Sequence, residues 1–240
     1  MNQGLSSNLT VLEKITKLKH SVCAKEQVSW VQQISMHDLD GQKALLELLI
    51  NRRTVQKVNI SSLDGIVFEI LIKSHYKAIR DEIKYYFPDG LFQLSTSFEV
   101  DYQSLQNLLI QQKYQDADRL TQIKLCELVG LDNKNERDWL YFTDISLISP
   151  NDLLIIDLLW RVYSRDKFGF SVQRQIWLSN NRNWEKLWRK IGWKNEGIAR
   201  RYPYEFIWNL NAPKGHLPLC NQLRGVQVLC ALFNHALWTK

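Results

Sequence analysis

The stretch that decides the fold is residues 140–179, LYFTDISLISPNDLLIIDLLWRVYSRDKFGFSVQRQIWLS. Its centre, residues 153–160, is apolar on nearly every side of a helix, which is typical of a helix in the middle of a domain or in a bilayer. A membrane span needs about 20 apolar residues, and this run is interrupted by Asp157 and followed by Arg161. The pattern therefore predicts a core helix. After it comes a turn, residues 168–173, whose two phenylalanines we expect to be exposed.

The composition of the 240 residues is that of an ordinary folded protein, with 23% charged and 45% apolar residues. Only 10 glycines and 5 prolines are present, and long alternating β-branched runs are missing, so an all-helical fold is predicted. The four cysteines form no C-x-x-C pair, which indicates small buried thiols in a reducing compartment. The first 20 residues lack the features of a signal or transit peptide, so we expect the protein to work in the compartment where it is made.

A Pro-x-Gly turn signal, FPDG at residues 87–90, divides the chain into two predicted domains. The first, residues 1–90, is expected to be a small helical bundle with helices at 5–20, 25–35, 39–52 and 61–86. The second, residues 98–238, is expected to contain helices at 102–112, 114–129, from 150 onward, 171–179, 183–191 and 219–238. An irregular segment at 197–218 lies between its last two helices.

Charge and tryptophan are concentrated in the last third of the chain. Residues 160–240 hold 14 Lys and Arg against 4 Asp and Glu, whereas residues 1–159 hold 17 against 21. Seven of the nine tryptophans also lie in residues 160–240. Basic residues mixed with flat aromatic ones suit a partner that is anionic and planar.

Three classes of partner fit this composition. Single-stranded nucleic acid would stack on exposed aromatic side chains, and an anionic membrane surface would need an amphipathic basic helix, which residues 183–194 partly provide. A flat carboxylated ligand would need an apolar slot with arginines at its mouth. Since Trp184 and Trp188 are at helical spacing, both are expected to be core residues.

The sequence motifs of common enzymes are missing. No H-E-x-x-H, G-x-S-x-G, P-loop or G-x-G-x-x-G motif occurs. An apparent calcium loop at residues 132–136 has Lys134 at its third position and Arg137 in place of the required glycine. These observations favour a binding protein over an enzyme, with no metal site.

Four strings, in order, resemble the genomes-uncoupled, tetrapyrrole-binding family. They are WLYFT at 139–143, KFGFSVQ at 167–173, IGWK at 191–194, and APKGHLP at 212–218 followed by NQLRGV at 221–226. The resemblance covers about residues 98–238. It implies an all-helical, cupped-hand core that holds protoporphyrin IX or Mg-protoporphyrin IX, with an N-terminal bundle like that of cyanobacterial and algal members.

The resemblance also implies a function and a set of site residues. Members of this family regulate magnesium chelatase in chlorophyll biosynthesis without catalysis of their own, by contact with its large subunit. The implied porphyrin-binding residues are Phe142, Ile145, Tyr202, Phe206, Asn221 and Arg224. An arginine can pair with a propionate, and an asparagine carbonyl is a hard oxygen donor suited to magnesium.

The chain departs from the family pattern at Tyr202 and Ala199, where tryptophan is common, and at Gln227, where a second basic residue is common. The implied location is the plastid stroma or the cyanobacterial cytoplasm, with peripheral membrane association and a monomeric state. The remaining alternative is an adaptor that binds nucleic acid or an anionic membrane surface through its basic last third.

Overall fold

Helix α8 (Pro150–Val162) contains the apolar run and lies in the core of the computed structural model. Leu153, Ile156, Leu159 and Trp160 are fully buried, while Leu154 is 37% exposed. The prediction of a core helix is confirmed. The structure describes residues 9–94, 100–131, 137–219 and 226–239, and within these ranges no helix is long and apolar enough to cross a membrane.

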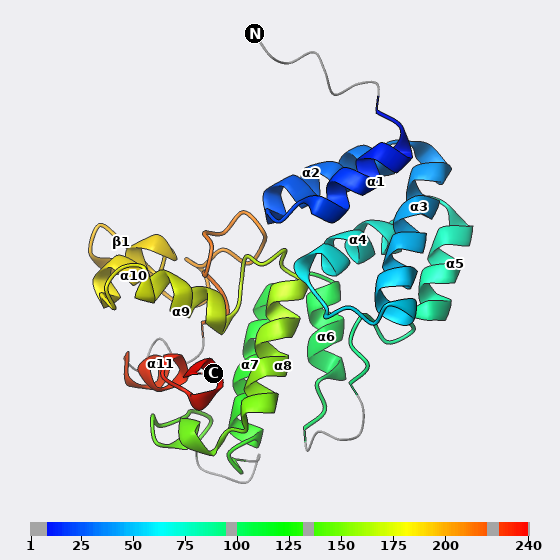
Figure 1. The fold of residues 1–240 in the computed structure, drawn as a ribbon. Coiled ribbons are helices and arrows are strands. Elements are labelled where there is room, and N and C mark those ends of the chain that lie inside the picture. The colour runs from blue at the N-terminus through cyan, green and yellow to red at the C-terminus, as the bar shows by residue number, and fades with distance from the viewer. Residues whose placement is uncertain (1–8, 95–99, 132–136, 220–225, 240) are drawn as a thin grey trace. The chain divides into compact units, whose positions relative to one another are not determined.

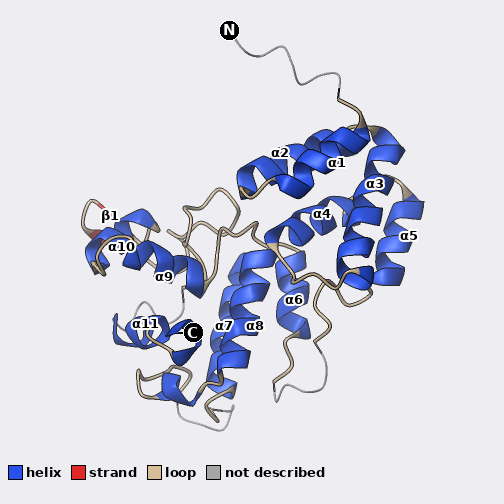
Figure 2. Ribbon diagram, viewed as in Figure 1, coloured by secondary structure: helices blue, strands red, loops and turns tan. Residues whose placement is uncertain are grey.

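The chain divides into two compact units, Met1–Leu91 and Phe92–Lys240. The sequence places its break at residues 87–90, one residue earlier. The predicted domain bounds, residues 1–90 and 98–238, stay a prediction. Helices dominate both units, so the predicted all-α class is confirmed (Figure 2).

Over its described residues, 9–91, the first unit is a bundle of five α-helices. They are α1 (Val11–His20), α2 (Ala24–Ser35), α3 (Asp38–Ile50), α4 (Ser62–Ile72) and α5 (Lys77–Tyr86), with a π-helical turn, η1 (Asn51–Val55), after α3. Helix α1 begins later than the predicted residue 5, because Thr10 and Glu13 form a capping box at its start.

The single helix predicted at residues 61–86 is wrong, since the structure has α4 and α5 in its place. Between them the buried Ser74 hydroxyl donates to Gln42 Oε1 and accepts the Tyr76 N–H at 3.0 Å. A serine that bonds to nearby backbone competes with the helical ladder. The chain therefore turns at Ser74 although the apolar spacing continues through it.

The second unit contains the helices that position the candidate site. They are α6 (Gln103–Ile110), α7 (Tyr114–Glu127), the 3-10 turn η2 (Asp144–Leu147), α8, α9 (Phe170–Leu178), α10 (Trp184–Lys190), α11 (Val226–Phe233) and the 3-10 turn η4 (Ala236–Thr239). A short antiparallel pair of strands, β1 (Lys194–Asn195) and β2 (Ile198–Ala199), was not predicted. It lies next to the end of α10 (Figure 1).

The turn after α8 differs from the prediction, because Phe168 and Phe170 are completely buried instead of exposed. The Phe168 ring packs edge-on against Tyr114 with centroids 5.4 Å apart. Gly169 has a φ of +130°, and a Cβ there would lie 2.9 Å from Asp157 Oδ1. The interruption of the apolar helix at Asp157 also has a structural role, since this carboxylate accepts the Ser171 N–H at 2.8 Å at the start of α9.

The FGFSVQ motif fixes the loop that precedes α11. Gln173 Nε2 donates to the carbonyl oxygens of Gly215 at 3.0 Å and Pro218 at 2.8 Å, and Gly169 N donates to Leu217 O at 3.0 Å. The family-like strings at 167–173 and 212–218 are therefore bonded to each other. We call these three hydrogen bonds the clamp before α11.

The single C-terminal helix predicted at residues 219–238 is also wrong. Leu219 is not helical, residues 220–225 lie outside the described ranges, and α11 ends at Phe233. Arg174 Nε donates to Phe233 O at 2.7 Å. His235 Nε2 lies 3.0 Å from Ile148 O. The first contact satisfies the last carbonyl of α11, and the second holds the chain that follows the helix.

Three described cysteines, Cys23, Cys126 and Cys230, are free thiols. Cys126 is buried, Cys230 is half-buried, and Cys23 is exposed. The expectation of buried thiols therefore fails at Cys23, which precedes α2 at the surface of the first unit.

Candidate functional site: an apolar pocket on the last helix

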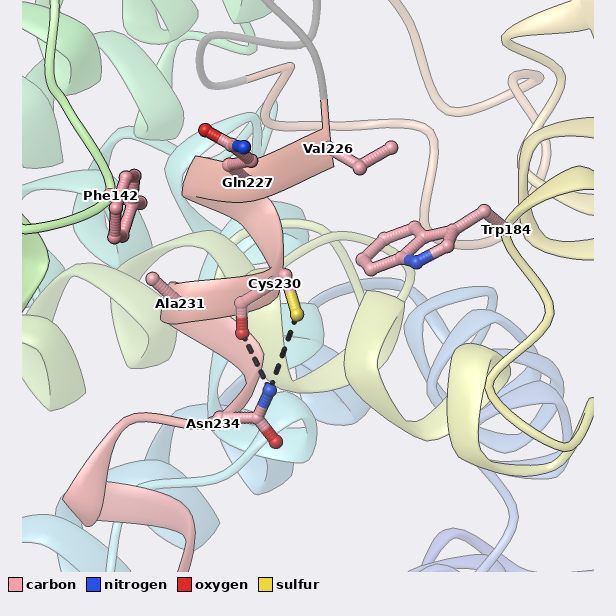
Figure 3. A pocket seen from close by; sticks show the side chains of 7 residues that line it. All are labelled: Phe142, Trp184, Val226, Gln227, Cys230, Ala231 and Asn234. Carbon is pink, nitrogen blue, oxygen red and sulfur yellow. Dashed lines mark hydrogen bonds between the residues drawn. The ribbon is translucent and has the colours of Figure 1, made fainter.

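A pocket of about 360 Å³ lies against helix α11 in the second unit (Figure 3). Its floor is one face of α11, because lining residues three and four apart on a helix lie on the same side. The lining residues are Phe142, Trp184, Val226, Gln227, Cys230, Ala231 and Asn234. The volume is in the range of pockets that hold small ligands.

Trp184 forms one wall of the pocket and is held in place by other aromatic rings. Its ring stacks on Phe233 with centroids 5.8 Å apart and an interplanar angle of 12°, and it lies 5.0 Å from the ring of Trp177. Asn183 caps α10 by accepting the Lys186 N–H at 2.9 Å, which fixes the start of the helix that carries Trp184. This wall is a flat, pre-positioned aromatic surface.

Phe142 lines the pocket opposite Trp184, and its side chain is 50% exposed (Figure 3). The loop that carries it is fastened by Asp144, whose Oδ2 accepts the Tyr141 N–H at 2.7 Å and an Arg137 N–H at 2.8 Å. The hydrogen bond from Arg137 lowers the pKa of Asp144, so the carboxylate stays charged. Two aromatic rings on separate, anchored segments thus border the pocket.

The polar groups of the described lining are uncharged. Asn234 Nδ2 donates to Cys230 O at 2.9 Å and lies 3.4 Å from Cys230 Sγ (Figure 3). Gln227 is the other amide. An apolar slot of this kind suits the face of a planar ring, while acidic groups on the ring would need cations from elsewhere.

The structure places the predicted site residues in different surroundings. Phe142 lines the pocket, whereas Ile145 is 1% exposed inside η2 and is not part of the lining. Asn221 and Arg224 lie outside the described residues, directly before α11.

The other two predicted residues, Tyr202 and Phe206, are on a loop that does not contribute to the lining. Tyr202 is half-buried with its ring edge-on to Trp208 at 5.9 Å. Phe206 is buried against His216 at 5.5 Å. Burial, followed by the nearby Asp118, raises the pKa of Tyr202.

Sequence reasoning missed most of the lining. Trp184 was expected in the core, but it is half-buried and faces the pocket. Cys230, Ala231 and Asn234 are at helical spacing from Gln227, so the face they share could have been read from the sequence. The side of α11 that meets solvent depends on how α9 packs against it, which the sequence alone does not specify.

Among the described residues, no group of three or more His, Cys, Asp or Glu side chains could hold a metal ion. His216 is occupied structurally, since its Nδ1 lies 2.6 Å from Ile191 O and its Nε2 accepts the Ile207 N–H at 3.1 Å. Burial lowers the pKa of His216, so the neutral imidazole bridges these two segments.

Comparison with known proteins gives one consistent result. A family model described as GUN4-like matches residues 95–236. The chain is 44% identical over 238 residues to the protein Ycf53 of Porphyra purpurea, covering 99% of both chains. It is 36% identical over 152 residues to the chloroplastic tetrapyrrole-binding protein of Arabidopsis thaliana, covering 60% of this chain and 56% of that one. The solved structure of GUN4 from Chlamydomonas reinhardtii aligns with a TM-score of 0.56 at 38% identity, over 61% of this chain and 95% of that one. The matched region includes every residue that lines the pocket.

Proposed function

This chain belongs to the GUN4-like family, and on that basis we propose that it binds protoporphyrin IX and Mg-protoporphyrin IX and activates magnesium chelatase. In this proposal it is a non-catalytic, monomeric regulator of chlorophyll biosynthesis. It acts on the large subunit of the chelatase in the plastid stroma or the cyanobacterial cytoplasm, with peripheral membrane association. The name of the Arabidopsis relative, a chloroplastic tetrapyrrole-binding protein, supports both the ligand class and the plastid.

The observation that carries the proposal is the pocket between Phe142 and Trp184 over the uncharged face of α11. Two aromatic walls suit the flat faces of a tetrapyrrole, whose stacking adds to the burial of apolar surface. We propose that Phe142 and Trp184 contact the ring, and that the buried Ile145 supports the segment that carries Phe142. Arg224 and Asn221, which precede α11, would supply the propionate partner and the oxygen donor for magnesium. Tyr202 and Phe206 would border the ligand from the preceding loop.

A fluorescence titration tests the binding. Saturable quenching of tryptophan emission by water-soluble deuteroporphyrin is expected, because eight of the nine tryptophans lie in the second unit. No quenching at tens of micromolar ligand would refute the proposal. Arg224→Ala should weaken binding, and an unchanged affinity would remove that residue from the site.

Trp184→Leu isolates the aromatic wall. Loss of its stacking should weaken porphyrin binding by about tenfold, measured by the absorbance shift of the porphyrin itself. Trp188→Leu is the matched control, since Trp188 is on the same helix with its ring 6.4 Å from that of Trp184 but does not line the pocket. Equal affinities for the two variants would contradict the assignment of Trp184.

The proposed activation of magnesium chelatase requires that the chain raise the rate of that enzyme in a porphyrin-dependent way.

A further inference from the structure

Helix α10 presents a row of cationic side chains to solvent. Lys186, Arg189 and Lys190 are exposed, and Arg182, just before the helix, is exposed as well. On the opposite side Leu187 is fully buried, and so is Ile191 at the end of the helix. We call the four residues Arg182, Lys186, Arg189 and Lys190 the cationic face of α10. Helix α10 itself packs on α9 in the second unit (Figure 1).

None of the four charges of this face is in an ion pair within the described part of the chain, although the Arg182 guanidinium lies over the Trp177 ring, 5.8 Å from its centroid. Glu185, the single acidic residue of α10, pairs with Lys194 Nζ at 2.6 Å and so faces away from the row. Lys186, Arg189 and Lys190 take part in no ion pair among the residues that the structure describes. Like charges three and four residues apart on a helix repel each other, so an anionic partner would relieve this repulsion.

The chemistry of the face narrows the class of partner. Single-stranded nucleic acid would need exposed aromatic rings beside the cations, but the Trp184 ring lines the pocket, and Lys194 Nζ lies 4.3 Å from the ring centroid of Trp188. Insertion into a membrane surface would need apolar side chains at the same face, and Leu187 and Ile191 are both buried. What remains is a purely polar, cationic surface, which is complementary to an acidic protein surface.

We propose that the cationic face of α10 docks an acidic surface of a partner protein. The inference rests on the proposed function, because the partner it implies is the large subunit of magnesium chelatase. The same helix supplies Trp184 to the pocket, so the docking surface and the ligand wall belong to one rigid element.

Charge reversal tests the proposal. The full chain with K186E, R189E and K190E is compared with wild type for binding to the purified large subunit, at low and at physiological salt. We expect affinity to fall by about tenfold or more, with most of the salt dependence lost. Porphyrin affinity should stay within about twofold of wild type, because none of the three residues lines the pocket. The milder K186Q/K190Q variant should give an intermediate loss.

The control is K77E/K84E, which reverses two exposed charges on α5 in the first unit and should bind as wild type does. If the α10 variant binds the large subunit like wild type, or if wild type itself does not bind it, the docking proposal is overturned. Loss of binding to phosphatidylglycerol vesicles or to poly(U), with subunit binding unchanged, would overturn it in favour of a membrane or nucleic-acid partner. The porphyrin titration of the same samples reports on the proposed ligand separately.

Discussion

The buried carboxyl group of Asp118 makes the stability of the second unit depend on pH. Asp118 is on α7, and its Oδ1 accepts the Leu219 N–H at 2.6 Å, just before the segment that leads to α11. Burial raises its pKa from 3.8 to about 7, against the opposing effect of that hydrogen bond. The native state therefore holds the proton more tightly than the unfolded chain does.

The sign and size of the effect follow from this difference. A raised pKa means that the contribution of Asp118 is complete below about pH 4 and is lost as the pH rises through 7. The interval between the pKa values of 3.8 and about 7 corresponds to a contribution of ~4 kcal/mol to the free energy of unfolding, of which ~3 kcal/mol should be lost between pH 5 and pH 8. In Asp118→Asn this dependence disappears, whereas the cost of burying the amide is the same at every pH. The free energy of unfolding of the variant relative to wild type should thus rise by ~3 kcal/mol from pH 5 to pH 8.

Urea unfolding followed by tryptophan emission measures this difference, because the signal comes mainly from the second unit. Asp116→Asn, an exposed aspartate two residues earlier on α7, is the matched control and should show the pH profile of wild type. Parallel profiles for Asp118→Asn and wild type would refute the argument that Asp118 titrates near neutrality.

Two further predictions concern the clamp before α11. Gly169→Ala should destabilise the protein by ~1–3 kcal/mol in thermal unfolding, since its Cβ would lie 2.9 Å from Asp157 Oδ1 at a φ of +130°. Gly197→Ala is the control, because a Cβ at Gly197 would have no atom within 4 Å, and it should destabilise the protein less. Because the pKa of buried His216 is lowered, stability should be complete above about pH 6.5 and fall below it. In His216→Gln this acid-side slope should flatten, and an unchanged slope would mean that another group titrates.

The sequence was sufficient for features that depend on composition and periodicity. The helical class and the core position of residues 153–160 follow from apolar spacing, and the GUN4-like family follows from motifs that prove to be bonded to each other through Gln173. Such features are local in the chain or fixed by short strings, and a sequence carries them directly.

Features that depend on a single distant contact were missed. Ser74, between α4 and α5, also bonds to Gln42, more than 30 residues away, and the apolar pattern gives no sign of this contact. Phe168 and Phe170 are in a turn, where exposure is expected, yet α7 and α8 cover Phe168. The position of Trp184 at the pocket depends on its stacking against Phe233 of α11, nearly 50 residues later in the chain.

The central claim is that the pocket on α11 holds a tetrapyrrole between two aromatic walls. The most direct test is a crystal structure of the chain bound to deuteroporphyrin. The account predicts electron density for the ring between Phe142 and Trp184, over the face of α11 that carries Gln227 and Cys230. A ring bound elsewhere on the chain, with this pocket unchanged and empty, would contradict it.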